Sequence, residues 1–96
     1  MGGIILWENP NPTVAFNAQT VTLSSSDYDY YEIYWATAAN NSFVSVNRSI
    51  KGYGTTLVIA NADGTAARRQ INYISDTRLN ITTGNGIPIK IIGYKS

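Results

Sequence analysis

The sequence predicts an all-β domain, a small antiparallel β-sandwich of the jelly-roll-like kind with about eight short strands. Of its 96 residues, 38 are Ile, Thr, Val, Tyr, Trp or Phe, the β-branched and aromatic types that are enriched in strands. Turn residues recur about every 8 to 12 positions, a spacing typical of antiparallel sandwiches and barrels. Between them, apolar and polar side chains alternate, as in a half-buried strand.

Clusters of Gly, Asn, Asp, Ser and Pro separate the expected strands. The first strand is followed by ENPNP, whose two prolines favour a loop over residues 8–12. The sequence ADG at 62–64 indicates a tight hairpin turn, because Asp-Gly accepts the positive φ angles that such a turn needs. The strands are expected at residues 4–7, 20–24, 29–37, 43–49, 55–60, 67–75, 78–82 and 87–94.

The alternation also predicts which side chains form the core. In the third strand, Tyr31, Ile33 and Trp35 share one face and are expected inside, opposite Tyr30, Glu32 and Tyr34. The predicted core is Ile33, Trp35, Leu57, Ile59, Ile71, Tyr73, Leu79 and Ile81. In the last strand, Ile89 and Ile91 are expected on one face, with Pro88, Lys90 and Ile92 on the other. That strand ends two residues before Ser96, where we expect a natural C-terminus.

Length and composition limit the domain organisation and the chemistry. Residues 4–96 are expected to form one sandwich domain, with residues 1–3 as a linker or the start of an expressed fragment. The chain has no Cys and no His, which excludes disulfides, thiolate nucleophiles and imidazole catalysis. Its longest apolar run, residues 4–7, is far too short to cross a bilayer, so we expect no membrane insertion.

Charge is distributed unevenly along the chain. Residues 1–48 hold one basic and four acidic residues, and residues 49–96 hold six basic and two acidic ones. The overall net charge is only +1, without the strong basic excess of a nucleic-acid-binding domain, so no nucleic-acid partner is expected. The asymmetry favours pairing of acidic and basic strands within the fold or between copies. The adjacent Arg68 and Arg69 should point to opposite faces of their strand.

The densest cluster of aromatic residues is DYDYYEIYW, at residues 27–35. Aromatic rings stack on sugars, and neighbouring carboxylates accept hydrogen bonds from sugar hydroxyls. The candidate ligand-binding residues, expected to face outward, are Tyr28, Tyr30, Glu32 and Tyr34. The same side chains could instead pack against a neighbouring subunit, where Tyr is enriched.

Carboxylates are the remaining candidates for catalysis and for metal binding. A glycosidase would need two of them across a cleft, such as Glu32 with Asp76 or Asp63, but a domain of this size has little room for a deep cleft. Asp27 and Asp29 lack the spacing of a calcium-binding loop and are interpreted as turn residues. We therefore expect no catalytic residues, no metal and no cofactor.

Three segments of the chain resemble a known group of proteins. LWENPNPTVAFNAQTV at 6–21, SDYD at 26–29 and IPIKIIGYK at 87–95 are similar to C-terminal domains of tail-fibre and baseplate structural proteins from bacteriophages and prophages of Gram-positive bacteria. The resemblance implies a non-enzymatic structural and attachment domain of the virion tail, made in the bacterial cytoplasm. It also implies a homotrimer that meets the host surface, with cell-surface polysaccharide as the expected ligand. The long shaft that precedes such domains is absent from this sequence, which has only residues 1–3 before the first strand.

A trimer would also cover apolar side chains that one sandwich core does not need. These are expected on the outer faces and comprise Phe43, Ile74, Ile92 and Tyr94. Two alternatives stay open, a free-standing carbohydrate-binding module and a small glycan-cleaving enzyme. The residues alone, without the resemblance, do not assign a function.

Overall fold

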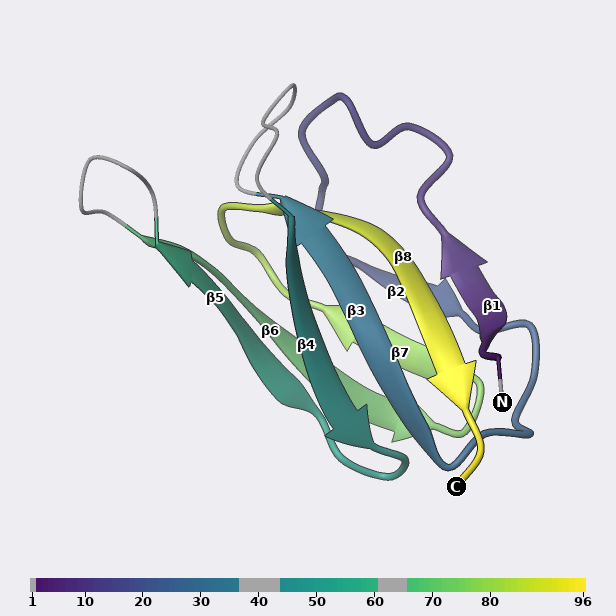
Figure 1. Cartoon of the computed structure of the whole chain (residues 1–96). Helices are drawn as coiled ribbons and strands as arrows, with labels where there is room; N and C mark the ends of the chain where they lie inside the picture. The colour runs from purple at the N-terminus through teal and green to yellow at the C-terminus, as the bar shows by residue number, and fades with distance from the viewer. Residues whose placement is uncertain (1, 37–43, 61–65) are drawn as a thin grey trace.

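The computed structural model describes residues 2–36, 44–60 and 66–96, which form two four-stranded antiparallel sheets packed as a sandwich (Figure 1). This confirms the predicted all-β fold, and each strand overlaps one expected range. Sheet A has the order β1-β8-β3-β4 and contains β1 (Ile4–Glu8), β3 (Tyr30–Ala36), β4 (Ser45–Ile50) and β8 (Ile87–Tyr94). Sheet B has the order β2-β7-β6-β5 and contains β2 (Gln19–Thr22), β5 (Thr55–Ala60), β6 (Ala66–Ser75) and β7 (Arg78–Ile81).

The chain crosses repeatedly between the two sheets, and its first and last strands lie side by side in sheet A. β1 pairs with β8 in sheet A and β2 pairs with β7 in sheet B, whereas β3–β4 and β5–β6–β7 pair with their neighbours in the sequence. Because Ile4 lies opposite Gly93, both termini leave at the same end of the sandwich. We call this the terminal end. The opposite end, the loop end, carries the β1–β2 and β7–β8 connections (Figure 1).

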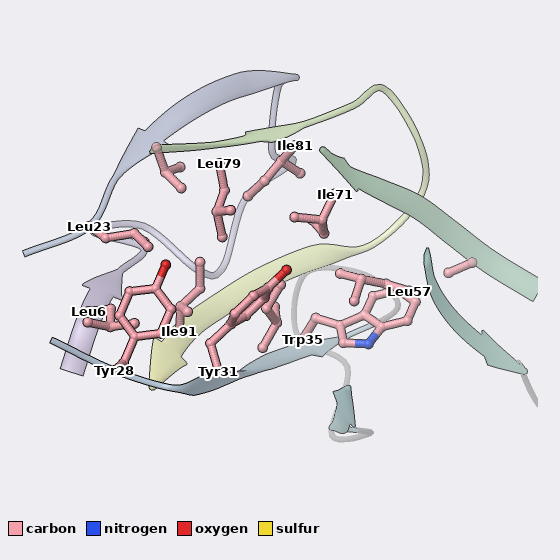
Figure 2. Packing of buried hydrophobic residues seen from close by; sticks show 13 residues of the cluster. Leu6, Leu23, Tyr28, Tyr31, Trp35, Leu57, Ile71, Leu79, Ile81 and Ile91 are labelled. Atoms are coloured by element: carbon pink, nitrogen blue, oxygen red, sulfur yellow. The ribbon is translucent and has the colours of Figure 1, made fainter. Parts of the chain in front are cut away.

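The core lies between the sheets, and its register is the predicted one (Figure 2). Trp35 is fully buried, and its indole Nε1 donates a hydrogen bond of 2.9 Å to Asn47 Oδ1, which satisfies its polar atom. Tyr73 is half-buried against the core, and the side chain of Ile59 lies outside the described residues. The other predicted core residues, all at most 1% exposed, are Ile33, Trp35, Leu57, Ile71, Leu79 and Ile81.

The last strand departs from strict alternation, so the predicted faces are confirmed for Ile91, Lys90 and Ile92 and wrong for Pro88. Along β8, Lys90 lies opposite Tyr34 but Pro88 lies opposite Trp35, which leaves Ile89 as the extra residue of a β-bulge. Pro88 is therefore buried on the same side as Ile91 instead of opposite to it. The lack of an N–H group on proline suits it to a bulge in a central strand.

Strand β4 turns its apolar side chains outward. Val46 is 45% exposed and Ile50 65% exposed, while the residues that alternate with them, Ser45, Asn47 and Ser49, are polar and point toward the core side. One of these inward residues is Asn47, the acceptor for Trp35, and another is Ser49, whose hydroxyl lies 3.3 Å from Tyr53 O. Contacts on the core side thus explain why Asn47 and Ser49 are polar, whereas the apolar side chains of Val46 and Ile50 remain exposed.

The two adjacent arginines of β6 point to opposite faces, as predicted. Arg68 is exposed, whereas Arg69 is only 3% exposed. The Arg69 guanidinium is satisfied by backbone carbonyls, with Nε donating to Gly86 O at 2.6 Å, Nη1 to Thr82 O at 2.7 Å and Nη2 to Phe16 O at 2.5 Å. Burial lowers the pKa of Arg69, yet an arginine stays protonated at neutral pH.

Some predictions concern residues outside the described ranges. The hairpin turn at 62–64 and the outward position of Phe43 belong to this group. In the part of the chain that the structure describes, no helix is long and apolar enough to span a membrane.

Candidate functional site

Three of the four candidate residues lie side by side on the outer surface of sheet A. Tyr30, Glu32 and Tyr34 project from the same side of β3, the strand between β8 and β4. Register places Tyr30 opposite Ile50 and Tyr94, Glu32 opposite Arg48 and Ile92, and Tyr34 opposite Val46 and Lys90. We call this surface the tyrosine face, comprising Tyr30, Glu32, Tyr34, Val46, Arg48, Ile50, Lys90, Ile92 and Tyr94.

Glu32 is the centre of the tyrosine face and is 9% exposed. Arg48 donates to Glu32 Oε2 from Nη2 at 2.7 Å and from Nε at 3.1 Å. This pair is the main reason that the pKa of Glu32 lies below its usual range, and hydrogen bonding by the Tyr94 and Tyr34 hydroxyls lowers it further. The same hydrogen bond to Glu32 raises the pKa of Tyr94 to about 12. Glu32 is thus an anion whose partners come from this face.

The rings of the tyrosine face are already stacked on one another or on cations. Tyr30 and Tyr94 lie parallel, with 5.2 Å between ring centroids and 13° between planes. The Arg48 guanidinium carbon lies 4.8 Å from the centroid of the Tyr30 ring, and Lys90 Nζ lies 4.8 Å from that of Tyr34. Stacking on a sugar needs a free ring face. The contacts with Tyr94 and Arg48 compete with a sugar for the Tyr30 ring, and Lys90 competes for that of Tyr34.

Tyr28 is not on this face, and the expectation that it points outward is wrong. Its side chain is 2% exposed and lies between the sheets near Tyr31 and Leu6 (Figure 2). Its hydroxyl donates to Asp76 O at 2.9 Å, and burial raises its pKa. A tight turn, in which Tyr28 N bonds to Ser26 O, precedes β3, so the alternation of the strand does not extend back to Tyr28.

The sequence did not identify the partners of Glu32. Arg48 lies 16 residues further along the chain, and Tyr94 comes from the last strand. Only the pairing of β3 with both β4 and β8 brings them together. The alternation in β4 and β8 predicts the face of each strand on which Arg48 and Lys90 lie. It does not predict that β4 and β8 are the neighbours of β3 in the sheet.

The geometry argues against the carboxylate pairs considered for glycan cleavage. Glu32 lies on the outer surface of sheet A, whereas Asp76 lies in the turn between β6 and β7 of sheet B, where its carboxylate accepts from the Tyr73 hydroxyl. The lowered pKa of Glu32 is also opposite to what a general acid needs. Asp63 belongs to the residues that are not described.

Asp27 and Asp29 lie in the connection before β3, as expected for turn residues, and both are engaged by the C-terminal residues. Lys95 Nζ is 2.7 Å from Asp27 Oδ1, a pair that joins the acidic half of the chain to the basic half. Ser96 donates to Asp29 Oδ2 from its backbone N at 2.8 Å, and this lowers the pKa of Asp29. Within the described ranges, no three acidic side chains are grouped so that they could hold a metal ion.

Comparison of the chain with protein-family models, with curated proteins and with solved structures gives no significant match.

Replacing Glu32 with glutamine should lower the free energy of unfolding at pH 7 by about 1 kcal/mol, a modest value because Arg48 is largely exposed. The pKa of Glu32 is lowered in the folded state, so its contribution is complete above the ordinary glutamate pKa and is lost as the pH falls through the folded one. Melting temperatures of the two proteins should therefore differ at pH 7 and converge in acid.

Glu8→Gln changes the other glutamate of the sequence, which is exposed, and serves as the matched control. Absorbance at 295 nm gives a second measurement, since loss of the Glu32 anion should bring the pKa of Tyr94 down from about 12. An unchanged tyrosine titration in Glu32→Gln would contradict the network.

Proposed function

We propose that this chain is a non-enzymatic structural and attachment domain of a bacteriophage or prophage tail-fibre or baseplate protein, that it forms a homotrimer through the tyrosine face, and that it meets polysaccharide on a Gram-positive host. The assignment to a virion tail is supported by the sequence resemblance of residues 6–21, 26–29 and 87–95. The assignment of the tyrosine face as the subunit contact is supported by the geometry of sheet A.

The observation that carries the proposal is the apolar and aromatic character of the tyrosine face. Val46 and Ile50 of β4 point outward and flank the tyrosine side chains of β3. The outer surface of sheet B is more polar, since its central strands present Arg68, Gln70, Asn72 and Asn80 beside one large apolar side chain, Ile74, which is 53% exposed as expected for an outer residue. Tyrosine is among the residues most enriched in subunit contacts, and an apolar face of this kind is stabilised by being covered.

The charged groups of the tyrosine face do not oppose its burial. Glu32 is paired with Arg48 at 2.7 Å, and Lys90 lies over the ring of Tyr34. A charge that enters an interface already paired and hydrogen-bonded has much of its desolvation offset. The tyrosine face therefore suits contact with another copy better than contact with a sugar ring.

The position of the termini suits the end of a fibre or baseplate protein. Both leave at the terminal end, because the start of β1 pairs with the end of β8. A shaft joined to the N-terminus would lie at this end, and the loop end would then point away from it (Figure 1).

The tyrosine-face proposal is tested by the mass of the protein in solution, measured by size-exclusion chromatography with light scattering. We expect a trimer for the wild-type chain and a monomer for Val46→Glu, because a carboxylate would be buried in the contact. Val58→Glu is the matched control. Val58 is 46% exposed, against 45% for Val46, and also lies on the outside of an edge strand, but in sheet B.

Dissociation by Val58→Glu alone would place the contact on sheet B instead. A wild-type chain that is monomeric at tens of micromolar, with thermal stability independent of dilution, would overturn the trimer. If such a monomer binds glycan, the alternative function, a free-standing carbohydrate-binding module, is supported.

A further inference from the structure

The loop end of the sandwich carries a hollow of about 350 Å³ that the tyrosine face does not include. It is formed by the end of β1 and by the connection between β1 and β2, at the opposite end from both termini (Figure 1). We call it the loop-end hollow. The lining residues that matter here are Trp7, Asn9, Asn11, Phe16, Asn17 and Gln19.

The aromatic side chains that line the loop-end hollow, Trp7 and Phe16, are held in place by contacts with each other and with Arg69. Trp7 and Phe16 meet edge to face, with 5.9 Å between ring centroids and 80° between planes. The buried Arg69 holds Phe16 twice, through a 2.5 Å hydrogen bond to its carbonyl and through the guanidinium, whose carbon lies 5.3 Å from the ring centroid. A wall that is already ordered costs little entropy when a ligand binds.

The polar wall consists of side-chain amides. Asn9 is anchored, because its Nδ2 donates to Pro88 O and its Oδ1 accepts from Asn11 N, both at 2.9 Å. Gln19 Nε2 donates to Asn17 O at 3.1 Å. Each amide group carries two donors and an oxygen with two lone pairs, so these bonds use only part of its capacity. The amides of Asn11 and Asn17 are on exposed residues.

Among the residues that the structure describes, those that line the loop-end hollow include no charged side chain. A phosphate, a sulfate or an acidic sugar would find no cation there, and a cationic ligand would find no carboxylate. Sugar hydroxyls, in contrast, both donate and accept, as amides do, and the C–H groups of a sugar ring pack on an indole. The chemistry of the lining therefore matches a neutral saccharide.

We propose that the loop-end hollow binds a neutral sugar unit of a polysaccharide, with Trp7 as the stacking residue and the amides of Asn11 and Asn17 as hydrogen-bonding groups. This inference rests on the attachment role proposed above and locates its ligand site. It places the site away from the tyrosine face, whose rings are already stacked, and on the end that points away from a shaft. Three copies in a trimer would give a weak single site useful avidity.

The test uses the whole chain on an array of neutral hexose, deoxyhexose and N-acetylhexosamine oligosaccharides, with sialylated, uronic-acid and phosphorylated ones beside them. A soluble neutral oligosaccharide that binds is then titrated by calorimetry, so that avidity does not contribute. We expect Trp7→Ala and Asn17→Ala each to weaken binding about tenfold or more. Asn72→Ala, an exposed asparagine on sheet B, should bind like the wild type.

Fluorescence provides a measurement that does not depend on a variant. Trp35 is fully buried and bonded to Asn47, so quenching by the bound sugar should come from the half-buried Trp7. The inference is overturned if only charged glycans bind, if no glycan binds, or if Tyr34→Ala abolishes binding while Asn17→Ala preserves it. The mass of the wild-type chain in solution is measured independently of these binding results, so failure of the site is distinguishable from failure of the trimer proposal.

Discussion

Replacing Gly86 with alanine is expected to lower the free energy of unfolding by about 3 kcal/mol. Gly86 has a φ of +128°, a conformation that costs an L-residue about 1–3 kcal/mol. A Cβ atom at this position would also lie 2.5 Å from Cζ3 of Trp35. The indole cannot move aside easily, because it is fully buried and hydrogen-bonded to Asn47, and overpacking of this kind typically costs about 1–3 kcal/mol.

Gly52→Ala is the matched control for this change. Gly52 also has a positive φ, +97°, but a Cβ atom there would meet no other atom within 4 Å. It should therefore show only the backbone cost, about 1 kcal/mol. Urea unfolding followed by circular dichroism measures both variants. Equal losses at the two positions would mean that the contact with Trp35 contributes nothing.

Replacing Arg69 with methionine is expected to lower the free energy of unfolding by about 3 kcal/mol. Methionine keeps the unbranched apolar part of the side chain, but the carbonyls of Phe16, Thr82 and Gly86 lose their donor. Hydrogen bonds to charged groups contribute more than neutral ones, and a buried acceptor left without a partner costs about 1–3 kcal/mol. Arg69→Lys should recover only part of the loss, since one ammonium cannot reproduce the guanidinium fork.

Arg68→Met provides the control one residue away in the same strand. Arg68 is exposed on the outer surface of sheet B, so its replacement should change the stability by less than about 0.5 kcal/mol. Urea unfolding separates the two arginines, and a chain with Arg69→Met that is as stable as one with Arg68→Met would show that the buried guanidinium is dispensable. Loss of order in the loop-end hollow should accompany the loss of stability, because Arg69 holds Phe16.

The strands were predictable because their signal is local. A strand with one buried face must alternate, and the alternation of residues 29–37 alone places Ile33 and Trp35 inside and Tyr34 outside. The prediction failed where the chain leaves regular β geometry. Tyr28 follows a tight turn, and Ile89 sits at a bulge, so counting by two gives the wrong face for Tyr28 and for Pro88.

The candidate site was predictable only in part. Tyr30, Glu32 and Tyr34 share a face by periodicity, and the structure keeps them together. The neighbours that determine their chemistry, Arg48 and Tyr94, come from strands whose order in the sheet is not encoded by alternation. The loop-end hollow could not be predicted either, because the amide and aromatic residues that line it look like those of an ordinary loop in the sequence. In the folded chain, Arg69 from a distant strand binds the carbonyl of Phe16 and holds this residue in the lining.

The all-β class, the strand ranges and the side of most strands that faces the core could be predicted from the residues, since these depend on residue type and on the two-residue period of the backbone. Tertiary structure alone decided the strand order, the burial of Arg69 and the pairing of Glu32 with Arg48. These features arise from groups far apart in the chain that meet only after both sheets have formed. Their energies depend on three-dimensional distance and burial, which no local pattern of residues specifies.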